Sequence, residues 1–450
     1  MNIIIIGSGT VGSAICSQLV KEGHDVTVID SDEKSLSEIS NTYDVTGILG
    51  NGADISLLRD AGVENADLLV AVAAMDEINM LCCYAAKKLG ASYTVARIRN
   101  PEYIPFMNLM KSDANLSMTI NPEYATAKEI VRNLKFPGAT KVDTFCDGMV
   151  EMAEFTVTKN SPICDLSLLD LREKLNIKFL VCGVLRGDKA YIPSGTFVLK
   201  EGDSICITAS EEELVKFFRL LGGKRKKAKH LIITGAGRTT YYLAKLLGKS
   251  IANATIIERD EARCEELSAE YNISVTHGDS TSQELLLEEG IESCDAFLAL
   301  SDVDEENAIV SMYAKKMGVP QIITMIRSLS YINFFKDAGI DSIVSPKSST
   351  VDYILRFVRG MADAQDSEIE SLHTVLDGKI EALEFVIKER IDGLTETPIS
   401  KIKRIPNSLI ACIARGEDII IPSGNDIIKI GDRVIVLATG SINNIKDILN

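Results

Sequence analysis

The chain opens with an apolar run that leads directly into a glycine-rich turn, NIIIIGSGTVG at residues 2–12. Four consecutive isoleucines predict a strand that is buried on both faces, as in a parallel sheet. Apolar residues then recur at helical spacing over residues 14–20, which places the turn between a strand and a helix. In that context Gly7, Gly9 and Gly12 match the G-x-G-x-x-G pattern of a dinucleotide-binding turn.

Each glycine of this turn has its own physical role. Gly7 permits the tight turn, Gly9 lets the backbone approach a pyrophosphate, and Gly12 lets the helix pack closely on the strand. The start of the helix presents unpaired N–H groups and the positive end of the helix dipole to the phosphates. We therefore take the whole turn as a candidate nucleotide site, formed by Gly7, Ser8, Gly9, Thr10, Val11 and Gly12.

The second predicted strand, residues 26–29, is followed by an acidic residue. Asp30 comes 18 residues after Gly12, a spacing at which its carboxylate can accept hydrogen bonds from the ribose hydroxyls of an adenosine. A 2′-phosphate would be repelled by that carboxylate, so the sequence predicts NAD(H) in preference to NADP(H). The alternative is a purely structural glycine turn with an unrelated capping aspartate.

Further strands are predicted at about 45–49, 68–73 and 93–98, with helices between them. This alternation predicts a doubly wound parallel sheet, in which ligands bind beyond the carboxyl ends of the strands. The residues that follow the third and fourth strands are therefore candidates, namely Asn51, Gly52, Ala73 and Ala74. Arg97 on the fifth strand is a candidate for a phosphate, with an interface ion pair as an equal alternative.

The sequence repeats itself at an offset of 228, since residues 1–100 share 29 identities with residues 229–328 without a gap. Such self-similarity indicates duplication. Each copy continues into a segment with strand-like runs, at 151–158, 178–185 and 204–209 in the first copy, and helix-like runs at 166–175 and 211–221. The predicted fold class is α/β, with two tandem Rossmann-like doubly wound parallel sheets, each followed by a small α+β subdomain. The predicted domains are residues 1–122, 139–222, 229–348 and 368–450.

The second glycine-rich turn departs from the pattern of the first. Thr240 stands where the third glycine is expected, Arg238 adds a cation near the phosphate position, and Glu258 replaces Asp30. A nucleotide with altered preference and an empty, structural fold both remain open for this copy. Its candidate residues are Gly235, Ala236, Gly237, Arg238, Thr239, Glu258, Asp279 and Leu300.

Composition excludes several classes of function. With 64 acidic and 48 basic residues, the net charge is −16, which argues against nucleic acid and against direct binding to anionic lipid. We expect no membrane span, because no apolar run approaches the ~18–20 residues that a spanning helix needs, and we expect no signal peptide. The basic run at residues 224–227 is predicted to be a solvated linker between the two copies.

The sequence also lacks the marks of catalysis. The ten cysteines form no C-x-x-C pair, and the four histidines are scattered, so we expect no metal site. A dehydrogenase needs a substrate domain with an acid or base beside the nicotinamide, and no convergent His, Lys and Tyr set is visible. We expect no catalytic residues and no enzymatic activity.

Several of these segments together resemble the RCK (KTN) domain family. The resemblance rests on IIIIGSGTVG at 3–12, VID at 28–30, ADLLVAV at 66–72 and DEIN at 76–79. The later PSG at 193–195 and GD at 202–203 resemble the C-terminal subdomain that follows such a domain. Two such units in one chain resemble the regulatory subunits of Trk-type potassium uptake systems, over essentially all 450 residues.

The resemblance implies a cytoplasmic, peripheral membrane protein that binds NAD(H), and often ATP or ADP, and gates a separate potassium-translocating membrane subunit. It also implies self-association of paired domains into a ring, a homotetramer with eight nucleotide-binding folds. The leading hypothesis is thus a nucleotide-gated regulator. An NAD-dependent oxidoreductase with an unrecognised catalytic site is the second, and a scaffold with vestigial sites is the third.

Overall fold

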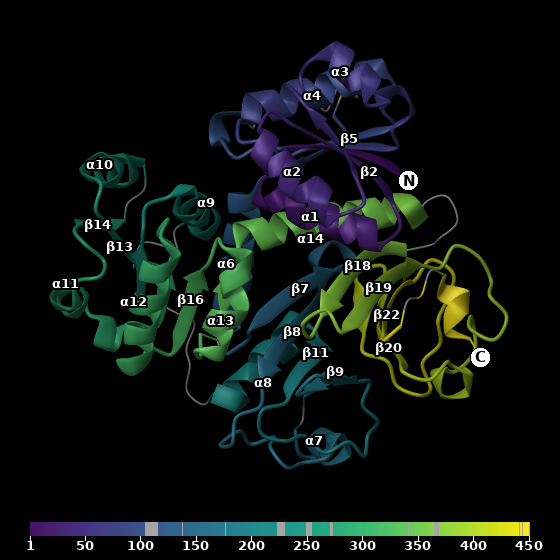
Figure 1. Ribbon diagram of the computed structural model, residues 1–450. Helices are drawn as coiled ribbons and strands as arrows, with labels where there is room; N and C mark the ends of the chain where they lie inside the picture. Colours follow the sequence, from purple (N-terminus) through teal and green to yellow (C-terminus); the bar gives the residue numbers. More distant parts are fainter. Residues whose placement is uncertain are drawn as a thin grey trace.

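Figure 1 shows the computed structural model of the chain, in which four sheets succeed one another along the sequence. The structure describes all residues except 104–115, 137, 176, 223–229, 249–253, 271–272, 341, 364–368, 441, 443 and 450. The predicted basic linker at residues 224–227 lies outside the described residues.

The first sheet has six parallel strands in the order β3-β2-β1-β4-β5-β6. Its central strands are buried along their length, as their continuous apolar sequence requires. The order reverses between β1 and β4, and a crevice forms at such a point beyond the carboxyl ends of the strands. The elements are β1 (Asn2–Ile6), α1 (Thr10–Lys21), β2 (Asp25–Asp30), α2 (Glu33–Thr42), β3 (Thr46–Leu49), α3 (Ile55–Asp60), β4 (Leu68–Ala71), α4 (Asp76–Leu89), β5 (Tyr93–Arg97) and β6 (Met118–Ile120).

The third sheet repeats this topology as β14-β13-β12-β15-β16-β17, again with parallel pairing. The predicted pair of tandem Rossmann-like sheets is confirmed. The elements of this copy are β12 (Leu231–Thr234), α9 (Arg238–Leu247), β13 (Ala254–Glu258), α10 (Glu261–Glu270), β14 (Ser274–His277), α11 (Gln283–Glu288), β15 (Ala296–Ala299), α12 (Asp304–Lys316), β16 (Gln321–Met325), α13 (Ile332–Asp337) and β17 (Ile343–Val344).

Each Rossmann-like sheet is followed by a helix that packs on the other copy (Figure 1). The helix α6 (Pro122–Lys135) starts with proline after an Asn121 cap and places Ile130 and Leu134 in the core beneath α9. The helix α14 (Pro346–Asp363) likewise places Ile354 and Val358 in the core beneath α1. Because each half completes the core of the other, the two halves form one structural unit.

The two C-terminal subdomains are antiparallel five-stranded sheets, β10-β9-β11-β8-β7 and β18-β19-β22-β20-β21. The three predicted strands of the first are confirmed, and β7 and β10 are additional. The elements are β7 (Lys141–Phe145), β8 (Val150–Thr156), α7 (Leu168–Lys174), β9 (Leu180–Arg186), β10 (Lys189–Tyr191), β11 (Ser204–Ala209), α8 (Glu211–Gly222), β18 (Ile369–Val375), β19 (Ile380–Val386), β20 (Ser408–Arg415), β21 (Asp418–Ile420) and β22 (Arg433–Ala438).

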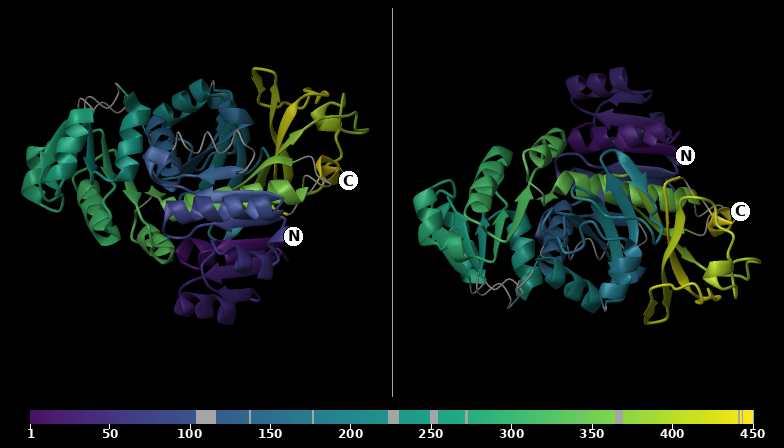
Figure 2. Two further views of the ribbon diagram at one scale, coloured as in Figure 1. Left: turned by 90° about the horizontal axis from the view of Figure 1, so that it is seen from above. Right: turned by 90° about the horizontal axis from the view of Figure 1, so that it is seen from below.

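The second subdomain differs from the first in its helices. Where α7 and α8 are expected, the described part of the chain has short 3-10 turns, Ile399–Lys401 and Ile445–Ile448. The two sheets share one apolar core, in which Phe145 and Met152 of the first meet Ile380 and Leu437 of the second. Figure 2 shows β18–β22 beside the first subdomain from above and from below. The two copies are therefore joined both through their Rossmann-like sheets and through their C-terminal subdomains.

Candidate nucleotide-binding site

The first glycine-rich turn is built so closely that two of its positions require glycine. Gly7 has φ +103°, and a Cβ there would lie 2.9 Å from the backbone nitrogen of Ala73. A Cβ on Gly12 would lie 1.9 Å from the carbonyl oxygen of Gly7, so any side chain would separate helix from strand. Gly9 has no atom near its absent Cβ and caps α1 without a side-chain hydrogen bond. The first N–H groups of α1 are thus available to an anion.

Asp30 holds the same turn from the end of β2. Its Oδ2 accepts hydrogen bonds from the backbone N–H of Ser8 at 2.5 Å and from Ser8 Oγ at 2.7 Å, and its Oδ1 accepts the N–H of Asp32 at 2.9 Å. Burial of Asp30 opposes its ionisation, but the bonds from Ser8 and Asp32 outweigh it and lower the pKa of the carboxyl. The carboxylate is therefore charged at neutral pH and retains lone pairs for ribose hydroxyls.

The remaining residues of the turn have different surroundings. Val11 is buried in the core, so only its backbone can face a ligand. Thr10 is exposed, and its Oγ1 lies 3.4 Å from Nζ of Lys347 at the start of α14. Lys347 thus brings a cation from the second copy to the start of α1 at the first turn. Sequence reasoning missed it because the contact depends on the crossing of α14 between the copies.

The turn after β3 forms the next edge of the crevice. Asn51 Oδ1 accepts the N–H of Ala53 at 3.0 Å, which closes the turn. A Cβ on Gly52 would lie 2.4 Å from Cγ2 of Ile6, so the chain passes directly over β1. Both residues shape the crevice through the backbone.

The segment after β4 is held by an amide that sequence reasoning did not assign to the site. Asn79 Oδ1 accepts the N–H of Ala73 at 2.8 Å, and its Nδ2 donates to the carbonyls of Ala73 and Arg97 at 3.0 and 2.9 Å. Arg97 Nη2 donates to the carbonyl of Ala73 at 2.8 Å, and burial lowers the pKa of this guanidinium. Arg97 therefore fixes the loop at Ala73. Asn307 makes equivalent bonds to Ser301 and Met325 in the second copy.

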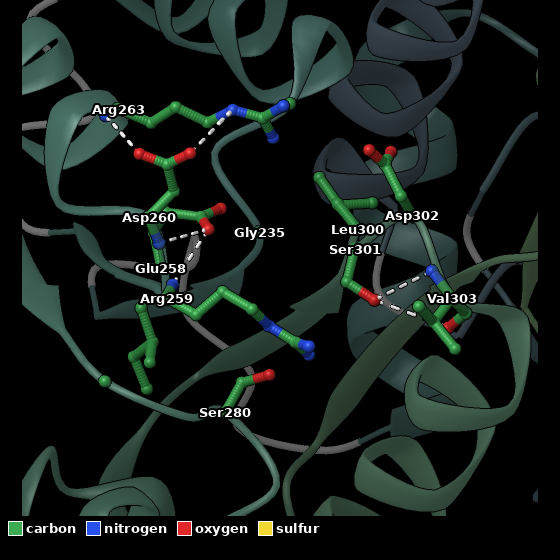
Figure 3. Close-up of a pocket in the computed structure, with 13 residues that line it drawn as sticks. Gly235, Glu258, Arg259, Asp260, Arg263, Ser280, Leu300, Ser301, Asp302 and Val303 are labelled. Atoms are coloured by element: carbon green, nitrogen blue, oxygen red, sulfur yellow. Dashed lines mark hydrogen bonds and ion pairs between the residues drawn. The ribbon is translucent and has the colours of Figure 1, made fainter.

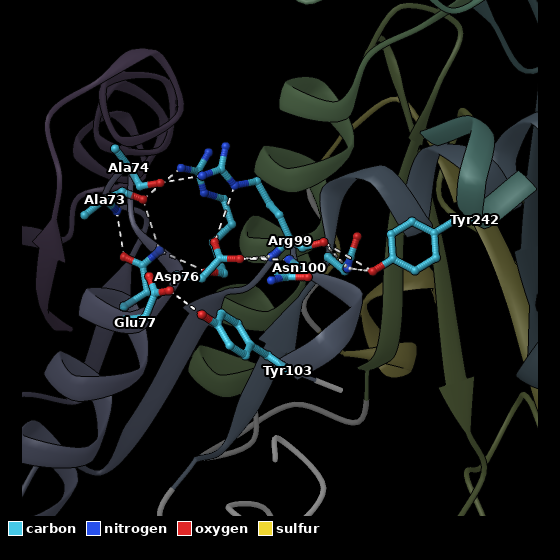
Figure 4. A network of polar contacts seen from close by, with 11 residues as sticks. Ala73, Ala74, Asp76, Glu77, Arg99, Asn100, Tyr103 and Tyr242 are labelled. Atoms are coloured by element: carbon cyan, nitrogen blue, oxygen red, sulfur yellow. Dashed lines mark hydrogen bonds and ion pairs between the residues drawn. The ribbon is translucent and has the colours of Figure 1, made fainter. Parts of the chain in front are cut away.

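A polar network connects the segment after β4, Ala73–Ala74, to the second copy (Figure 4). The guanidinium of Arg99 donates to the carbonyl of Ala74, and Asp76 accepts the backbone N–H of Arg99 at 2.8 Å. The carbonyl of Arg99 accepts the hydroxyl of Tyr242 at 3.2 Å, and Asn121 donates to the same hydroxyl at 2.8 Å. Tyr242 belongs to α9 and is only 1% exposed, and burial raises its pKa to about 12. The first site is therefore bonded directly to the second copy.

The second turn keeps the same shape with a different chemistry. Gly235 has φ +91°, and a Cβ there would lie 2.7 Å from Cα of Ser301. Thr240 donates its hydroxyl to the carbonyl of Gly235 at 2.6 Å, the atom equivalent to the one that excludes a side chain at Gly12. A hydrogen bond thus replaces the close glycine contact. Thr239 is buried against Met325, so only its backbone can face a ligand.

Glu258 takes the place of Asp30. Its Oε2 accepts the N–H of Ala236 at 2.6 Å, and its Oε1 accepts the N–H groups of Arg259 and Asp260 at 2.8 and 2.9 Å. It lies in the wall of a cavity of about 230 Å³ (Figure 3), which is lined by Gly235, Gly237, Ile257, Glu258, Arg259, Asp260, Arg263, Gly278, Ser280, Leu300, Ser301, Asp302 and Val303. The candidates Glu258 and Leu300 therefore meet at one cavity.

Asp279 lies beside that cavity, whose wall is formed by its neighbours Gly278 and Ser280. Its Oδ1 accepts the N–H and the hydroxyl of Thr281 at 2.9 and 2.8 Å, and the bond from the N–H is the larger cause of its lowered pKa. The Asp279 carboxylate closes a turn, and Ser280 is the residue that reaches the cavity.

A second cavity, of about 650 Å³, lies between the two copies and shares Gly237, Arg263 and Asp302 with the first. Its lining carries both charges, with the cations Arg99, Arg238, Lys245, Arg263 and Arg327 and the carboxylates Glu102, Glu123, Glu266 and Asp302. Burial raises the pKa of Glu123 on α6, which also lines this cavity, while Arg99, Arg238 and Arg327 act in the opposite direction. Arg238 therefore faces the junction of the copies.

Two further observations bear on the class of protein. Among the described residues, no helix is both long and apolar enough to cross a membrane. Within the same part of the chain, no three His, Cys, Asp or Glu side chains are grouped so that they could hold a metal ion. The ten cysteines are unbridged.

Comparison with known proteins places the chain among its relatives. The TrkA-N domain family matches residues 3–121 and 231–346, and the TrkA-C domain family matches residues 152–222. Trk system potassium uptake protein TrkA homolog 1 of Methanosarcina mazei is 33% identical in an alignment that covers 98% of each chain. Trk system potassium uptake protein TrkA of Haemophilus influenzae is 31% identical, over 98% of this chain and 97% of that one.

Solved structures share the fold. The GsuK RCK domain has a TM-score of 0.63 at 18% identity and covers 98% of this chain and 92% of that one. The GsuK channel bound to NAD has the same TM-score at 17% identity, over 98% and 77%. From the domain matches and the full-length relatives, the chain belongs to the TrkA family, with two TrkA-N domains and a TrkA-C domain after the first.

Proposed function

We propose that the chain is the nucleotide-binding regulatory subunit of a potassium uptake system and gates a separate membrane subunit. Its full-length relatives are named as Trk system potassium uptake proteins. The single observation that carries the nucleotide part is the first turn, where Gly12 cannot bear a side chain and α1 begins without a side-chain cap. Such a turn is suited to a pyrophosphate.

NAD(H) is the proposed ligand of the first site. The charged carboxylate of Asp30 stands at the end of β2, where it would accept the ribose hydroxyls and repel a 2′-phosphate. Asn51, Gly52, Ala73 and Ala74 form the edges of the crevice, and Lys347 contributes a cation from α14. The GsuK channel, a structural neighbour, is described as bound to NAD.

ATP or ADP is the proposed ligand of the second site. Thr240 preserves the turn, and Arg238 places a guanidinium at the junction of the two copies, where a terminal phosphate would be stabilised by charge. Glu258 is available at the position of the ribose acceptor. GsuK bound to ADP is another structural neighbour, at a TM-score of 0.51.

Regulation follows if nucleotides bind two arrangements of the copies with different affinity. Arg99 links the two copies, because its guanidinium donates to the carbonyl of Ala74 and its own carbonyl accepts the hydroxyl of Tyr242. A ligand that moves the segment Ala73–Ala74 would therefore move α9 as well. We propose the domain division 1–122, 139–222, 229–348 and 368–450, with paired domains that assemble further into a homotetrameric ring. In this proposal the protein acts in the cytoplasm, attached to the membrane through its partner.

Potassium flux tests this proposal directly. Vesicles that contain the Trk-type membrane subunit are compared with and without the chain across a series of NAD, NADH, ATP and ADP concentrations. We expect the chain to make flux depend on nucleotide, while the Asp30→Ala variant still associates with the vesicles and responds less to NAD(H). Flux that is identical under all conditions would contradict the proposal. Turnover of NADH with a small carbonyl substrate would instead favour the oxidoreductase alternative.

A further inference from the structure

A carboxylate lies over the second glycine-rich turn and has no counterpart in the first. A Cβ added to Gly237, the second glycine of this turn, would lie 3.7 Å from Oδ1 of Asp302. At Gly9, the equivalent position of the first turn, an added Cβ would have no atom within 4 Å. The second glycine of the pattern is the one over which the backbone approaches a pyrophosphate. The side of the turn that receives a phosphate is therefore open in the first copy and faces a carboxylate oxygen in the second.

Asp302 is the counterpart of Ala74 at the repeat offset of 228. It follows β15 as Ala74 follows β4, and both residues are exposed. Asp302 lines the cavity of about 230 Å³ in whose wall Glu258 lies, and also the cavity of about 650 Å³ between the copies. In Figure 3, Asp302 and Glu258 stand on opposite sides of the smaller cavity. Glu258 is therefore at the proposed ribose end of this cavity, and Asp302 is at the phosphate end.

The Asp302 carboxylate is held by an arginine that has another partner in the first copy. The guanidinium of Arg327 donates to Oδ1 of Asp302. The guanidinium of its counterpart, Arg99, donates instead to the carbonyl of Ala74. The side chains of Arg327 and Asp302 are 37% and 54% exposed, so their ion pair is a weak one that another anion can replace. Movement of Asp302 would thus release the guanidinium of Arg327 for a different acceptor.

The two arginines that line the smaller cavity are also paired with carboxylates. The guanidinium of Arg259 pairs with Glu306, and Nε of Arg263 lies 4.0 Å from Oδ2 of Asp260. A phosphate at this turn would find the N–H groups at the start of α9, which has no side-chain cap. It would also meet the carboxylate of Asp302, whose like charge opposes its approach. The second turn therefore has donors for a phosphate and a competing anion beside them.

We propose that the Asp302 carboxylate competes with the phosphates of a nucleotide for the second turn. This inference rests on the proposed assignment of ATP or ADP to the second site. On binding, Asp302 turns away from Gly237, and a phosphate replaces it as the partner of Arg327. Because Asp302 lines both cavities, its displacement also changes the distribution of charge between the two copies. Asp302 thus lowers the affinity of the second site for phosphates, and the first site has no such residue.

The test compares the intact chain with its Asp302→Asn variant, which keeps the size of the side chain and removes its charge. ATP, ADP and adenosine are titrated by calorimetry into protein saturated with NADH, at low salt and with EDTA, so that no divalent ion bridges carboxylate and phosphate. We expect the variant to bind ATP and ADP about 2- to 5-fold more tightly, the effect of removing one partly exposed ion pair. Adenosine, which carries no phosphate, should bind both proteins equally. The gain should shrink as salt is raised.

Two further variants serve as controls. Glu305→Gln changes an exposed glutamate that lines neither cavity, and it should leave all three affinities unchanged. Ala74→Asp gives the first copy the carboxylate of the second, at an exposed position whose carbonyl already accepts a bond from Arg99. We expect this variant to bind NADH about 2- to 5-fold more weakly at the first site and to bind ATP at the second site as the wild type does.

Equal ATP affinity in the wild type and in Asp302→Asn would overturn this inference and leave the proposed function standing. Weaker ATP binding in Asp302→Asn would also overturn it, because the carboxylate would then belong to the nucleotide site. An equal gain for adenosine, or an unchanged NADH affinity in Ala74→Asp, would do the same. Absence of ATP and ADP binding to every form of the chain would contradict the proposed function of the second site, and this inference with it.

Discussion

The two Rossmann-like halves have the same strand order and hold their glycine-rich turns in different ways. In the first, the carbonyl of Gly7 leaves no room for a Cβ on Gly12. In the second, the equivalent carbonyl of Gly235 accepts a hydrogen bond from Thr240 at 2.6 Å. The third glycine of the pattern is therefore one solution to helix–strand packing, and a buried hydroxyl is another.

The halves also differ in where their charges lie. Thr10 of the first turn corresponds to Arg238 of the second, and Glu123 at the start of α6 corresponds to Lys347 at the start of α14. The first turn therefore meets a lysine from the other half, at 3.4 Å. The second carries its own arginine in a cavity shared with the glutamate. The two duplicated sites are therefore not equivalent, because the first takes its cation from the other half and the second carries its own.

Gly12→Thr, which gives the first turn the residue of the second, has the largest expected effect. The new Cβ would approach the Gly7 carbonyl to 1.9 Å, so the backbone must move. Overpacking of this kind costs ~1–3 kcal/mol, and the displaced turn should lose at least ~100-fold in NADH affinity. Urea unfolding and calorimetry measure both quantities.

Thr240→Gly is the matched control. It removes the hydrogen bond to Gly235 without a clash and should leave NADH binding at the first site unchanged. Retained NADH affinity in Gly12→Thr would show that the fit of the first turn does not determine ligand binding.

Asp30→Ala tests the ribose acceptor. The change removes a charged acceptor, whose hydrogen bonds contribute ~1.5–3 kcal/mol, so NADH affinity should fall roughly 10- to 150-fold. Loss of the bonds from Ser8 contributes to the effect, which Ser8→Ala measures separately. Glu258→Gln, the control in the second half, should not change NADH binding. A larger loss in Glu258→Gln than in Asp30→Ala would reverse the assignment of the two sites.

Lys347→Ala tests the cation that α14 brings to the first turn. Lys347 is half-buried and close to Thr10, so its loss should weaken NADH about 2- to 5-fold, the effect of losing one partly exposed ion pair. The difference between variant and wild type should shrink as salt is raised. Lys34→Ala, at an exposed lysine on α2, serves as the control. An effect that salt leaves unchanged would point to packing of α14 instead of charge.

Tyr242 gives the smallest effect, and one that depends on pH. Its pKa is raised by burial to about 12, above the ~10 of an unfolded tyrosine. The phenol therefore contributes stability that is full below pH ~10 and is lost as the pH rises through the folded-state pKa. The stability difference between wild type and Tyr242→Phe should be constant below pH ~10 and should narrow between pH ~10 and pH ~12 in urea unfolding. A constant difference would contradict the buried position of the hydroxyl.

Local sequence predicted much of the fold because the deciding interactions are local. The helix α4, Asp76–Leu89, lies between the predicted strands at 68–73 and 93–98, where the sequence analysis places a helix, because Gly90 stops it and apolar spacing defines its face. The roles of Gly7 and Gly12 also follow from the turn alone. Short edge strands such as β10 were missed, since three residues show no periodicity.

Contacts between the copies could not be predicted in the same way. The crossing of α6 and α14 depends on which sheet each helix covers, and both helices have the same pattern whichever sheet they cover. Lys347 therefore gave no local signal as a site residue. The direction of the Arg97 guanidinium depends on the carbonyl of Ala73, which only the folded chain brings near. Whether the predicted nucleotide residues bind their ligand remains a prediction.

The most direct test of the account is calorimetric titration of the intact chain with NADH and then with ATP. We expect one NADH per chain, held at the first site, and ATP that binds afterwards at the second site without displacing NADH. The same titration of Asp30→Ala should show NADH binding weakened roughly 10- to 150-fold and ATP binding unchanged. Two equivalent NADH sites per chain, or NADH that is fully displaced by ATP, would contradict the assignment of NADH to the first site and ATP to the second.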